Sequence, residues 1–268
     1  MPYRIDIDHA GSVLFDRLIE LGAIDAELAG DGIAALMPDN LTPEQISRAL
    51  GVSHVAVSAA IGRDENSVWI LSQRPIQVGR LRLLPAHSDV EHSDVEPKAI
   101  RLVDTTAFGT GLHPTTAMCL EVLDEAVQHE PPDAVLDVGI GSGVLALAAL
   151  VLGVPRATGL DIDDDALRVA AENGRLNGMD GRLQLTRGGP DAVSGAWPLV
   201  LANVLAAPLI EMAPALVQRV GHRGVLVLSG IPASVEQSVD KAYERFGMRR
   251  VRAVSRAGWV ALVLRASW

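Results

Sequence analysis

Very little in this sequence points to a membrane or to secretion. The longest nearly continuous apolar run, Val144 to Val154, is shorter than the roughly 20 residues that a membrane-spanning helix needs. The N-terminal residues include acidic side chains and no apolar stretch of signal-peptide length. A single cysteine, Cys119, excludes an internal disulfide, and its place in an apolar helical pattern predicts burial. We therefore expect a cytoplasmic protein with no membrane association.

Basic residues are also in the minority. The 268 residues include 23 Lys and Arg against 33 Asp and Glu, which gives a net charge of −10. Such a balance argues against direct, sequence-independent nucleic-acid binding and favours a basic partner. Residues 42–60 superficially resemble a helix-turn-helix with Gly51 at the turn, but this segment is nearly free of Lys and Arg, which disfavours DNA binding.

The chain is long enough for one main domain and a smaller one. Residues 1–86 predict a small α+β domain, with one helix ending at Gly22, a second capped at Thr42, and β-like runs at 67–71 and 76–84. A tandem His-Ser-Asp-Val-Glu repeat then occupies residues 87–96. Its low hydrophobicity predicts a solvated linker over 87–98, without the fixed geometry of a metal site. Residues 99–268 form the second domain.

From residue 134 onward, strand-like and helix-like segments alternate, which predicts parallel βαβ units in a covered sheet. The last two strands are joined by only Ser255 to Gly258 and predict an antiparallel hairpin. The fold class is therefore α/β and Rossmann-like, with a mostly parallel seven-stranded sheet. The predicted strands are 134–138, 157–162, 182–186, 199–203, 224–229, 249–254 and 259–265, and the helices are 144–152, 164–177, 207–220 and 233–246.

The strongest local motif is a strand that runs into the turn Gly139-Ile140-Gly141-Ser142-Gly143 before a helix. Glycines allow a ligand to approach the backbone, and the positive end of the helix faces it. The spacing differs from the dinucleotide fingerprint, which requires a glycine where this chain has Val144. The loop predicts a nucleotide-like ligand, with its class left open.

Polar residues at the ends of two other strands complete a candidate site. Asp161 ends the second strand, where a carboxylate is placed to accept the ribose hydroxyls of an adenosine; the alternative is a cap for the next helix, a role open to Asp163 as well. Asn203 leaves an apolar strand at its carboxyl end, which favours a site over packing. The loop from Ala107 to Thr116 is rich in glycine and hydroxyl residues; ligand contact and an elaborate helix cap explain it equally well.

These motifs together resemble a family, the bacterial ribosomal protein methyltransferases named PrmA, which methylate the large-subunit protein numbered eleven. The resemblance runs from about residue 74 to the C-terminus and is most specific in the Phe-Gly-Thr-Gly-x-His-Pro-Thr-Thr string that begins at Phe108. It implies a class I methyltransferase domain that binds S-adenosyl-L-methionine. The cofactor-binding residues that it implies are Phe108, Gly109, Thr110, Thr116, Gly139, Gly141, Asp161 and Asn203.

The resemblance also implies methylation of lysine or amino groups on a basic ribosomal protein, with Asn203 as the catalytic residue and residues 1–86 as the recognition domain. Asn203 offers a carbonyl that orients the amine, and His113 is an alternative proton acceptor. The string Asn203-Val204-Leu205 replaces the Asn-Pro-Pro-Tyr of enzymes that act on planar nitrogens, which favours an aliphatic amine. Another protein or a small molecule as acceptor, a nicotinamide-dependent dehydrogenase and a non-catalytic binding module are the competing interpretations.

Overall fold

The computed structural model describes residues 2–8, 12–29, 32–60, 75–86, 88, 97–103 and 113–268. The chain forms two compact units, Met1–Gln73 and Arg74–Trp268, each with its own core. The division lies before the predicted boundary after residue 86. In the described part of the chain, no helix combines the length and the apolar character needed to cross a membrane.

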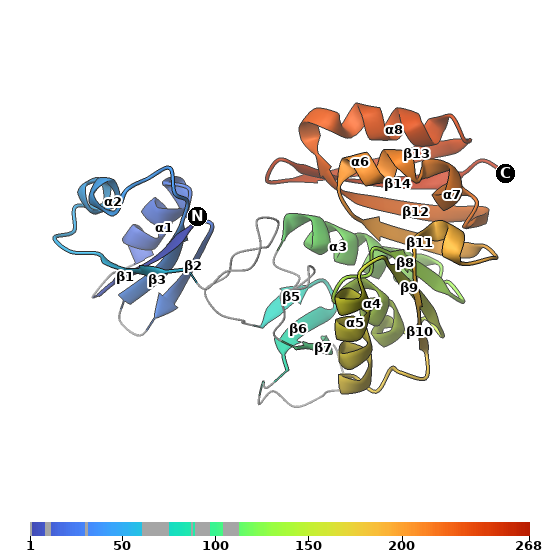
Figure 1. The fold of residues 1–268 in the computed structure, drawn as a ribbon, viewed down its shortest axis with the longest axis horizontal. Helices are drawn as coiled ribbons and strands as arrows, with labels where there is room; N and C mark the ends of the chain where they lie inside the picture. Colours follow the sequence, from blue (N-terminus) through green and yellow to red (C-terminus); the bar gives the residue numbers. More distant parts are fainter. Residues whose placement is uncertain are drawn as a thin grey trace. The chain divides into compact units, whose positions relative to one another are not determined.

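The first unit is a small α+β domain (Figure 1). Its four-stranded antiparallel sheet has the order β2-β3-β1-β4 and packs its apolar face on two helices, with Ile5, Leu18 and Ile46 fully buried between them. The split βαβ order brings the first and third strands side by side. The elements are β1 (Tyr3–Ile7), α1 (Ser12–Glu20), β2 (Asp25–Ala29), β3 (Gly32–Met37), α2 (Pro43–Leu50) and β4 (Ala56–Ala59).

The predicted cap at Thr42 is confirmed, because its hydroxyl accepts from the Gln45 amide and the Gln45 side chain accepts from the Thr42 amide. Gly51 ends α2 in the left-handed conformation, with φ of 71°. The chain then enters strand β4, so the resemblance of residues 42–60 to a helix-turn-helix is not carried into the fold.

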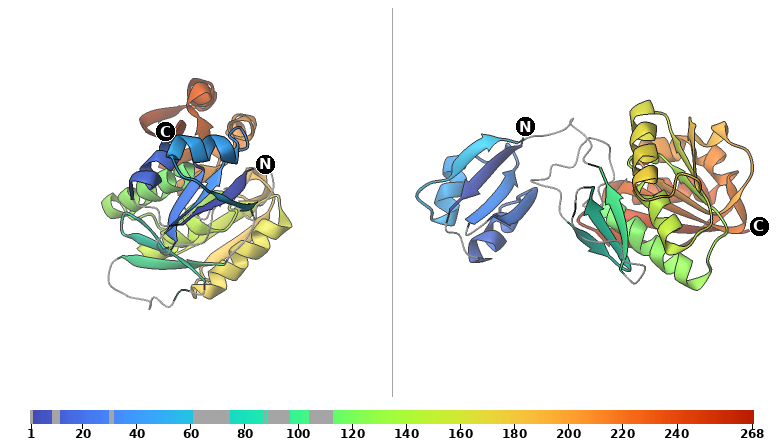
Figure 2. Two further views of the ribbon diagram at one scale, coloured as in Figure 1. Left: turned by 90° about the vertical axis from the view of Figure 1, so that its left-hand side faces the viewer. Right: turned by 90° about the horizontal axis from the view of Figure 1, so that it is seen from below.

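A three-stranded sheet opens the second unit and explains the early division of the chain. The predicted strand at 76–84 is a hairpin of β5 (Ile76–Val78) and β6 (Leu81–Pro85), and β6 pairs in parallel with β7 (Lys98–Leu102). This sheet covers α3 (Pro114–His129) and its neighbours in the second unit (Figure 2). Lys98, predicted as the end of the linker, begins β7, and residues 89–96 lie outside the described residues.

Seven strands form the main sheet in the order β10-β9-β8-β11-β12-β14-β13. The first five are parallel, and β14 is antiparallel to both of its neighbours, which confirms the predicted hairpin. The strands are β8 (Val135–Val138), β9 (Ala157–Asp161), β10 (Leu183–Arg187), β11 (Trp197–Asn203), β12 (Val220–Pro232), β13 (Met248–Arg256) and β14 (Trp259–Ala266).

Helices cover both faces of this sheet and bury separate apolar cores against them (Figure 1). One core involves α3, α4 (Val144–Leu152) and α5 (Asp164–Leu176), and the other involves α6 (Ala206–Glu211), α7 (Ala213–Val217) and α8 (Glu236–Glu244). The sequence predicts one helix over 207–220, but the structure has α6 and α7. Pro214 lacks an amide hydrogen and clashes with the preceding turn, so the helix is interrupted at Met212.

Candidate functional site

Three segments meet at the point in the main sheet where the strand order reverses, between β8 and β11. The strands β9 and β10 lie on one side of β8, and β11 lies on the other. Ligands of open α/β sheets bind beyond the carboxyl ends of the strands at such a switch point. The glycine turn follows β8, Asp161 ends β9, and Asn203 ends β11. The predicted site residues of the described part of the chain therefore gather at one edge.

The turn after β8 requires glycine at several positions. Gly139, Gly141 and Gly143 have φ of 73°, 54° and 83°, in the left-handed region that other residues rarely adopt. A Cβ on Gly139 would lie 2.3 Å from Cγ1 of Val204, so this glycine also allows the turn to pack on the segment after β11. The amides of Gly139 and Ile140 both donate to the Leu160 carbonyl, at 2.8 and 2.9 Å, which ties the turn to β9.

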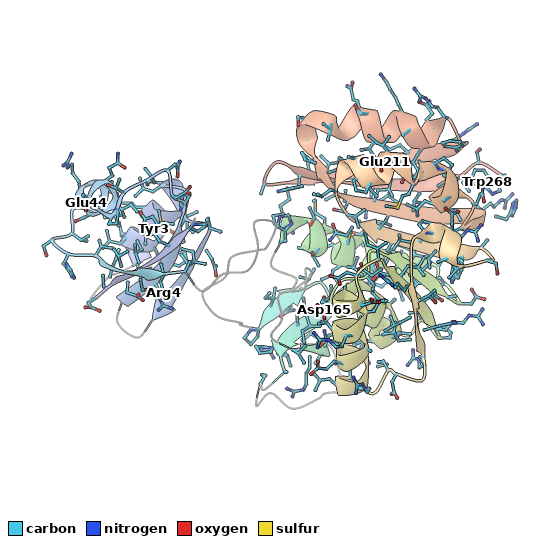
Figure 3. The ribbon with its side chains drawn as sticks, viewed as in Figure 1. Tyr3, Arg4, Glu44, Asp165, Glu211 and Trp268 are labelled. Atoms are coloured by element: carbon cyan, nitrogen blue, oxygen red, sulfur yellow. The ribbon has the colours of Figure 1, made fainter. Side chains whose placement is uncertain are left out.

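Asp161 connects β9 to the same turn. Its Oδ2 accepts from the Gly141 amide at 3.0 Å, and its Oδ1 accepts from the Asp163 amide at 3.0 Å. The helix cap proper belongs to Asp163, whose Oδ1 accepts from the amide of Asp165 at 2.9 Å. Asp165 lies at the start of α5 (Figure 3). Since a carboxylate has about four lone-pair sites, Asp161 retains acceptor capacity for a ligand hydroxyl.

Asn203 and Thr116 meet from β11 and α3. The Asn203 side-chain amide donates to Thr116 Oγ1 at 3.2 Å, and both residues are buried, with exposed fractions of 8% and 0%. The side-chain carbonyl of Asn203, Oδ1, has no hydrogen-bond partner among the described residues. A buried acceptor of this kind costs free energy unless a ligand or water satisfies it. The pair thus presents one unused acceptor at the carboxyl end of β11.

Two ionisable groups are buried beneath the site. Burial raises the pKa of Asp137 on β8 well above its ordinary value, and the nearby Asp161 carboxylate raises it further. Asp137 Oδ2 accepts from the Ala146 amide at 3.2 Å, while Oδ1 is without a partner among the residues described. Burial also raises the pKa of Cys119 to about 12, so this thiol stays protonated at neutral pH. The predicted burial of Cys119 is confirmed.

His113 caps α3, with Nδ1 2.7 Å from Thr115 Oγ1 and accepting from the Thr115 amide at 3.3 Å. Its ring meets the Trp259 ring edge to face, with centroids 5.0 Å apart. Burial lowers the pKa of His113, which favours the neutral imidazole. This geometry supports the cap interpretation for the end of the 107–116 loop. Phe108, Gly109 and Thr110, also predicted to bind the cofactor, lie outside the described residues.

The remaining predicted site residues form a connected set. Thr116 contacts Asn203, the next residue Val204 packs on Gly139, and Gly141 contacts Asp161. Sequence reasoning did not single out Asp137 or Asn173, whose Nδ2 donates to the Ser142 carbonyl at 2.8 Å. A charged residue inside the apolar strand 135–138 was a usable signal for Asp137. For Asn173 the i,i+4 spacing with Asn177 indicates only a shared helix face, and not the contact with Ser142.

The strand order and the antiparallel hairpin are those of an α/β methyltransferase domain. Comparison with known proteins gives the particular family. The chain belongs to the family described as ribosomal protein L11 methyltransferase (PrmA), whose sequence model matches residues 34–267.

Individual relatives agree with this assignment. A ribosomal protein L11 methyltransferase of Geobacter sulfurreducens is 40% identical over 235 residues, which cover 82% of this chain and 76% of the relative. One of Pelobacter propionicus is 36% identical over 219 residues, covering 81% and 71%. The crystal structure of a ribosomal protein L11 methylase from Lactobacillus delbrueckii subsp. bulgaricus aligns with a TM-score of 0.65 and 29% identity, covering 72% of this chain and 98% of that one.

Proposed function

We propose that this methyltransferase uses S-adenosyl-L-methionine to methylate lysine or amino groups of ribosomal protein L11, in the cytoplasm. The observation that carries the proposal is the family match over residues 34–267 together with relatives that are named for this reaction. The negative net charge of −10 supports a basic protein substrate. The predicted absence of nucleic-acid binding belongs to the same proposal.

The residues at the switch point fit a nucleoside-bearing methyl donor. When bound, S-adenosyl-L-methionine supplies a methyl group on a positively charged sulfur. Asp161 would accept hydrogen bonds from the ribose hydroxyls through the lone pairs that the amides of Gly141 and Asp163 leave unused. The left-handed backbone of Gly139 and Gly141 shapes the turn that would hold the donor, and Thr116 would contact it as well, as the resemblance implies. Phe108, Gly109 and Thr110 are assigned to the same pocket on the resemblance alone.

Asn203 binds the methyl acceptor as well as the methyl donor. A lysine amine has an ordinary pKa of about 10.4 and must lose a proton before it attacks a methyl carbon. Transfer from water into a buried site lowers this pKa. The unpartnered Asn203 Oδ1 then accepts a hydrogen bond from the amine and directs its lone pair, while Thr116 holds the side chain in place. His113, neutral and engaged in the α3 cap, is not required as a base.

The proposal is tested by incubating the purified protein with labelled S-adenosyl-L-methionine and purified ribosomal protein L11. A second ribosomal protein of similar size and charge serves as the control acceptor. We expect label on L11 alone, located by mass spectrometry on lysine side chains or the α-amino group. Labelling of both proteins to the same extent, or of neither, would contradict L11 as the substrate, whereas donor binding without L11 labelling would retain the donor and reject the acceptor.

A further inference from the structure

Helix α5 also holds the glycine turn, at a different residue from the one that Asp161 contacts. Asn173 is fully buried in this helix, and its Nδ2 donates to the Ser142 carbonyl at 2.8 Å. Ser142 lies between Gly141 and Gly143, whose backbones are both left-handed. Glycine-flanked backbone is intrinsically mobile, so a buried hydrogen bond from a helix restricts the turn more than it would restrict an ordinary residue.

The same asparagine also anchors the end of β7. Its Oδ1 accepts from the Val103 amide at 2.8 Å. One helical turn later, Asn177 Oδ1 accepts from the Arg101 amide at 2.8 Å, and its Nδ2 donates to the Arg101 carbonyl at 2.7 Å. The side chains of Asn173 and Asn177, four residues apart on one helix face, thus form hydrogen bonds to the backbone of residues 101–103 as a neighbouring strand would. Asn173 alone of the pair reaches the glycine turn.

The turn is therefore fixed at two backbone atoms, by Asp161 at the end of β9 and by Asn173 within α5. Asp161 accepts the Gly141 amide, and Asn173 donates to the carbonyl of the next residue, Ser142. Both bonds join protein groups only, so they constrain the backbone of the turn independently of the donor. Preorganisation of this kind increases affinity because the ligand does not have to order the backbone itself.

We propose that Asn173 is a positioning residue for the methyl donor, and that its bond to Ser142, rather than its bond to β7, sets donor affinity. This inference rests on the proposed function, since it assumes that the turn binds the donor. Asn173 does not act on the acceptor, so its loss is expected to raise the donor KM while kcat at saturating donor stays within about twofold of wild type.

The test compares Asn173→Asp with the matched control Asn177→Asp. Each change keeps an oxygen for a backbone amide, Val103 just after β7 or Arg101 within it, and removes side-chain N–H bonds to backbone carbonyls. Asn173 loses the bond to Ser142 in the glycine turn, whereas Asn177 loses bonds to Arg101 and to the Asn173 carbonyl, neither of which lies in that turn. Asn173→Ala and Asn177→Ala repeat the comparison without a buried charge, in case the aspartates prevent folding. Donor affinity is measured by calorimetry, and folding by the thermal transition.

We expect the Asn173 variants to bind S-adenosyl-L-methionine about tenfold more weakly, the order of a lost buried hydrogen bond. The Asn177 variants should bind it within about twofold of wild type although their melting temperatures also fall. Equal losses in both pairs, or unchanged affinity in the Asn173 variants, would overturn the inference while leaving the proposed function standing. A wild-type protein that fails to bind the donor would overturn the proposed function and this inference with it.

Discussion

At the scale of single residues, each residue of the site has its own proposed role, and that of Asp161 is to bind the ribose of the donor. We expect Asp161→Ala to weaken donor binding by about 1.5–3 kcal/mol, the range for hydrogen bonds to a charged group. The matched control is Asp163→Ala, which removes the α5 cap and costs about 1 kcal/mol of stability. Calorimetry on both folded variants distinguishes the two roles. Equal affinity in the two variants would remove Asp161 from the site.

Asn203 differs from Asp161 because it is assigned to both donor and acceptor. Asn203→Ala removes the unpartnered Oδ1 and the bond to Thr116. We expect kcat to fall at least about tenfold, and by a larger factor than donor affinity, since the bond to the amine matters most in the transition state. Turnover on L11 and donor affinity are compared in one preparation. Parallel losses in the two quantities would reduce Asn203 to a binding residue.

Asp137 makes stability depend on pH in an unusual direction for a carboxylate. Its native pKa is raised by burial, so the folded protein keeps the proton that the unfolded chain releases above about pH 3.9. Its contribution is therefore fully present in acid and decreases as pH rises toward the native pKa. Asp137→Asn cannot titrate and keeps an oxygen for the Ala146 amide.

We therefore expect Asp137→Asn to gain stability relative to wild type as pH rises, by up to about 1.4 kcal/mol per pH unit. Denaturant unfolding of both proteins between pH 5 and 8 measures the difference, from which the other titrating groups cancel. A difference that stays constant over this range would show that Asp137 ionises normally in the folded protein.

The site residues that sequence reasoning identified are those whose polarity conflicts with their local pattern. Asp161 and Asn203 each end an apolar strand, and parallel strands bring such ends to one edge. Asn173 could not be assigned in this way, because its partner Ser142 lies on another element and the contact depends on how α5 packs beside the turn. Pairing at that distance is a property of the tertiary structure.

At the scale of elements, Gly139 and Gly230 leave the space that Val204 occupies just after β11. A Cβ on Gly230 would lie 2.2 Å from the Val204 carbonyl oxygen, and its φ is 82°. Gly178 has a similar φ of 65° but open space around it, so Gly178→Ala isolates the backbone strain alone. We expect Gly230→Ala to be destabilised by about 1–3 kcal/mol more than Gly178→Ala, as in overpacked cores.

The Gly230→Ala change should also lower methylation, because the displaced backbone immediately follows Asn203. Chemical denaturation and turnover at saturating donor measure the two effects. Gly178→Ala should retain wild-type turnover. Equal stability of the two variants would mean that the chain after β11 relaxes without cost.

Elements with a clear hydrophobic pattern were predictable from the sequence. The strand pairing and the unit to which a strand belongs were not, because they depend on neighbouring elements. The apolar helix α4 occupies the predicted residues 144–152, because all its positions favour one buried helix. The strand-like run at 76–84 was assigned to the wrong unit because its alternation indicates a strand without indicating its partner. The gap in the helix at Met212 depends on Pro214, a local signal that the apolar pattern of 207–220 obscured.

For the whole molecule, the division after Gln73 changes how the N-terminal unit must be tested. Strands β5 and β6 belong to the catalytic unit, where Arg80 is bonded to Asp124 on α3. Burial alone would raise the pKa of Asp124, but the hydrogen bonds from Arg80 and Gln128 and the charge of Arg80 together outweigh it and lower this pKa. Removal of Arg80 would leave a carboxylate that is only 5% exposed without this partner, which is strongly destabilising.

Two truncations therefore distinguish recognition from folding. We infer that the N-terminal unit holds the ribosomal protein, since a tethered substrate reaches the active site at a raised local concentration.

Deletion of residues 1–73 should leave donor affinity and melting temperature near those of the full chain while it sharply reduces L11 methylation. Deletion of residues 1–86 also removes β5 and β6 and, with Leu81 and Leu83, part of the apolar core of the second unit, and it should lower the melting temperature and weaken donor binding. Calorimetry, thermal unfolding and L11 methylation are measured on both. Full L11 activity after deletion of residues 1–73 would reject the recognition role and favour an acceptor that the catalytic unit binds alone.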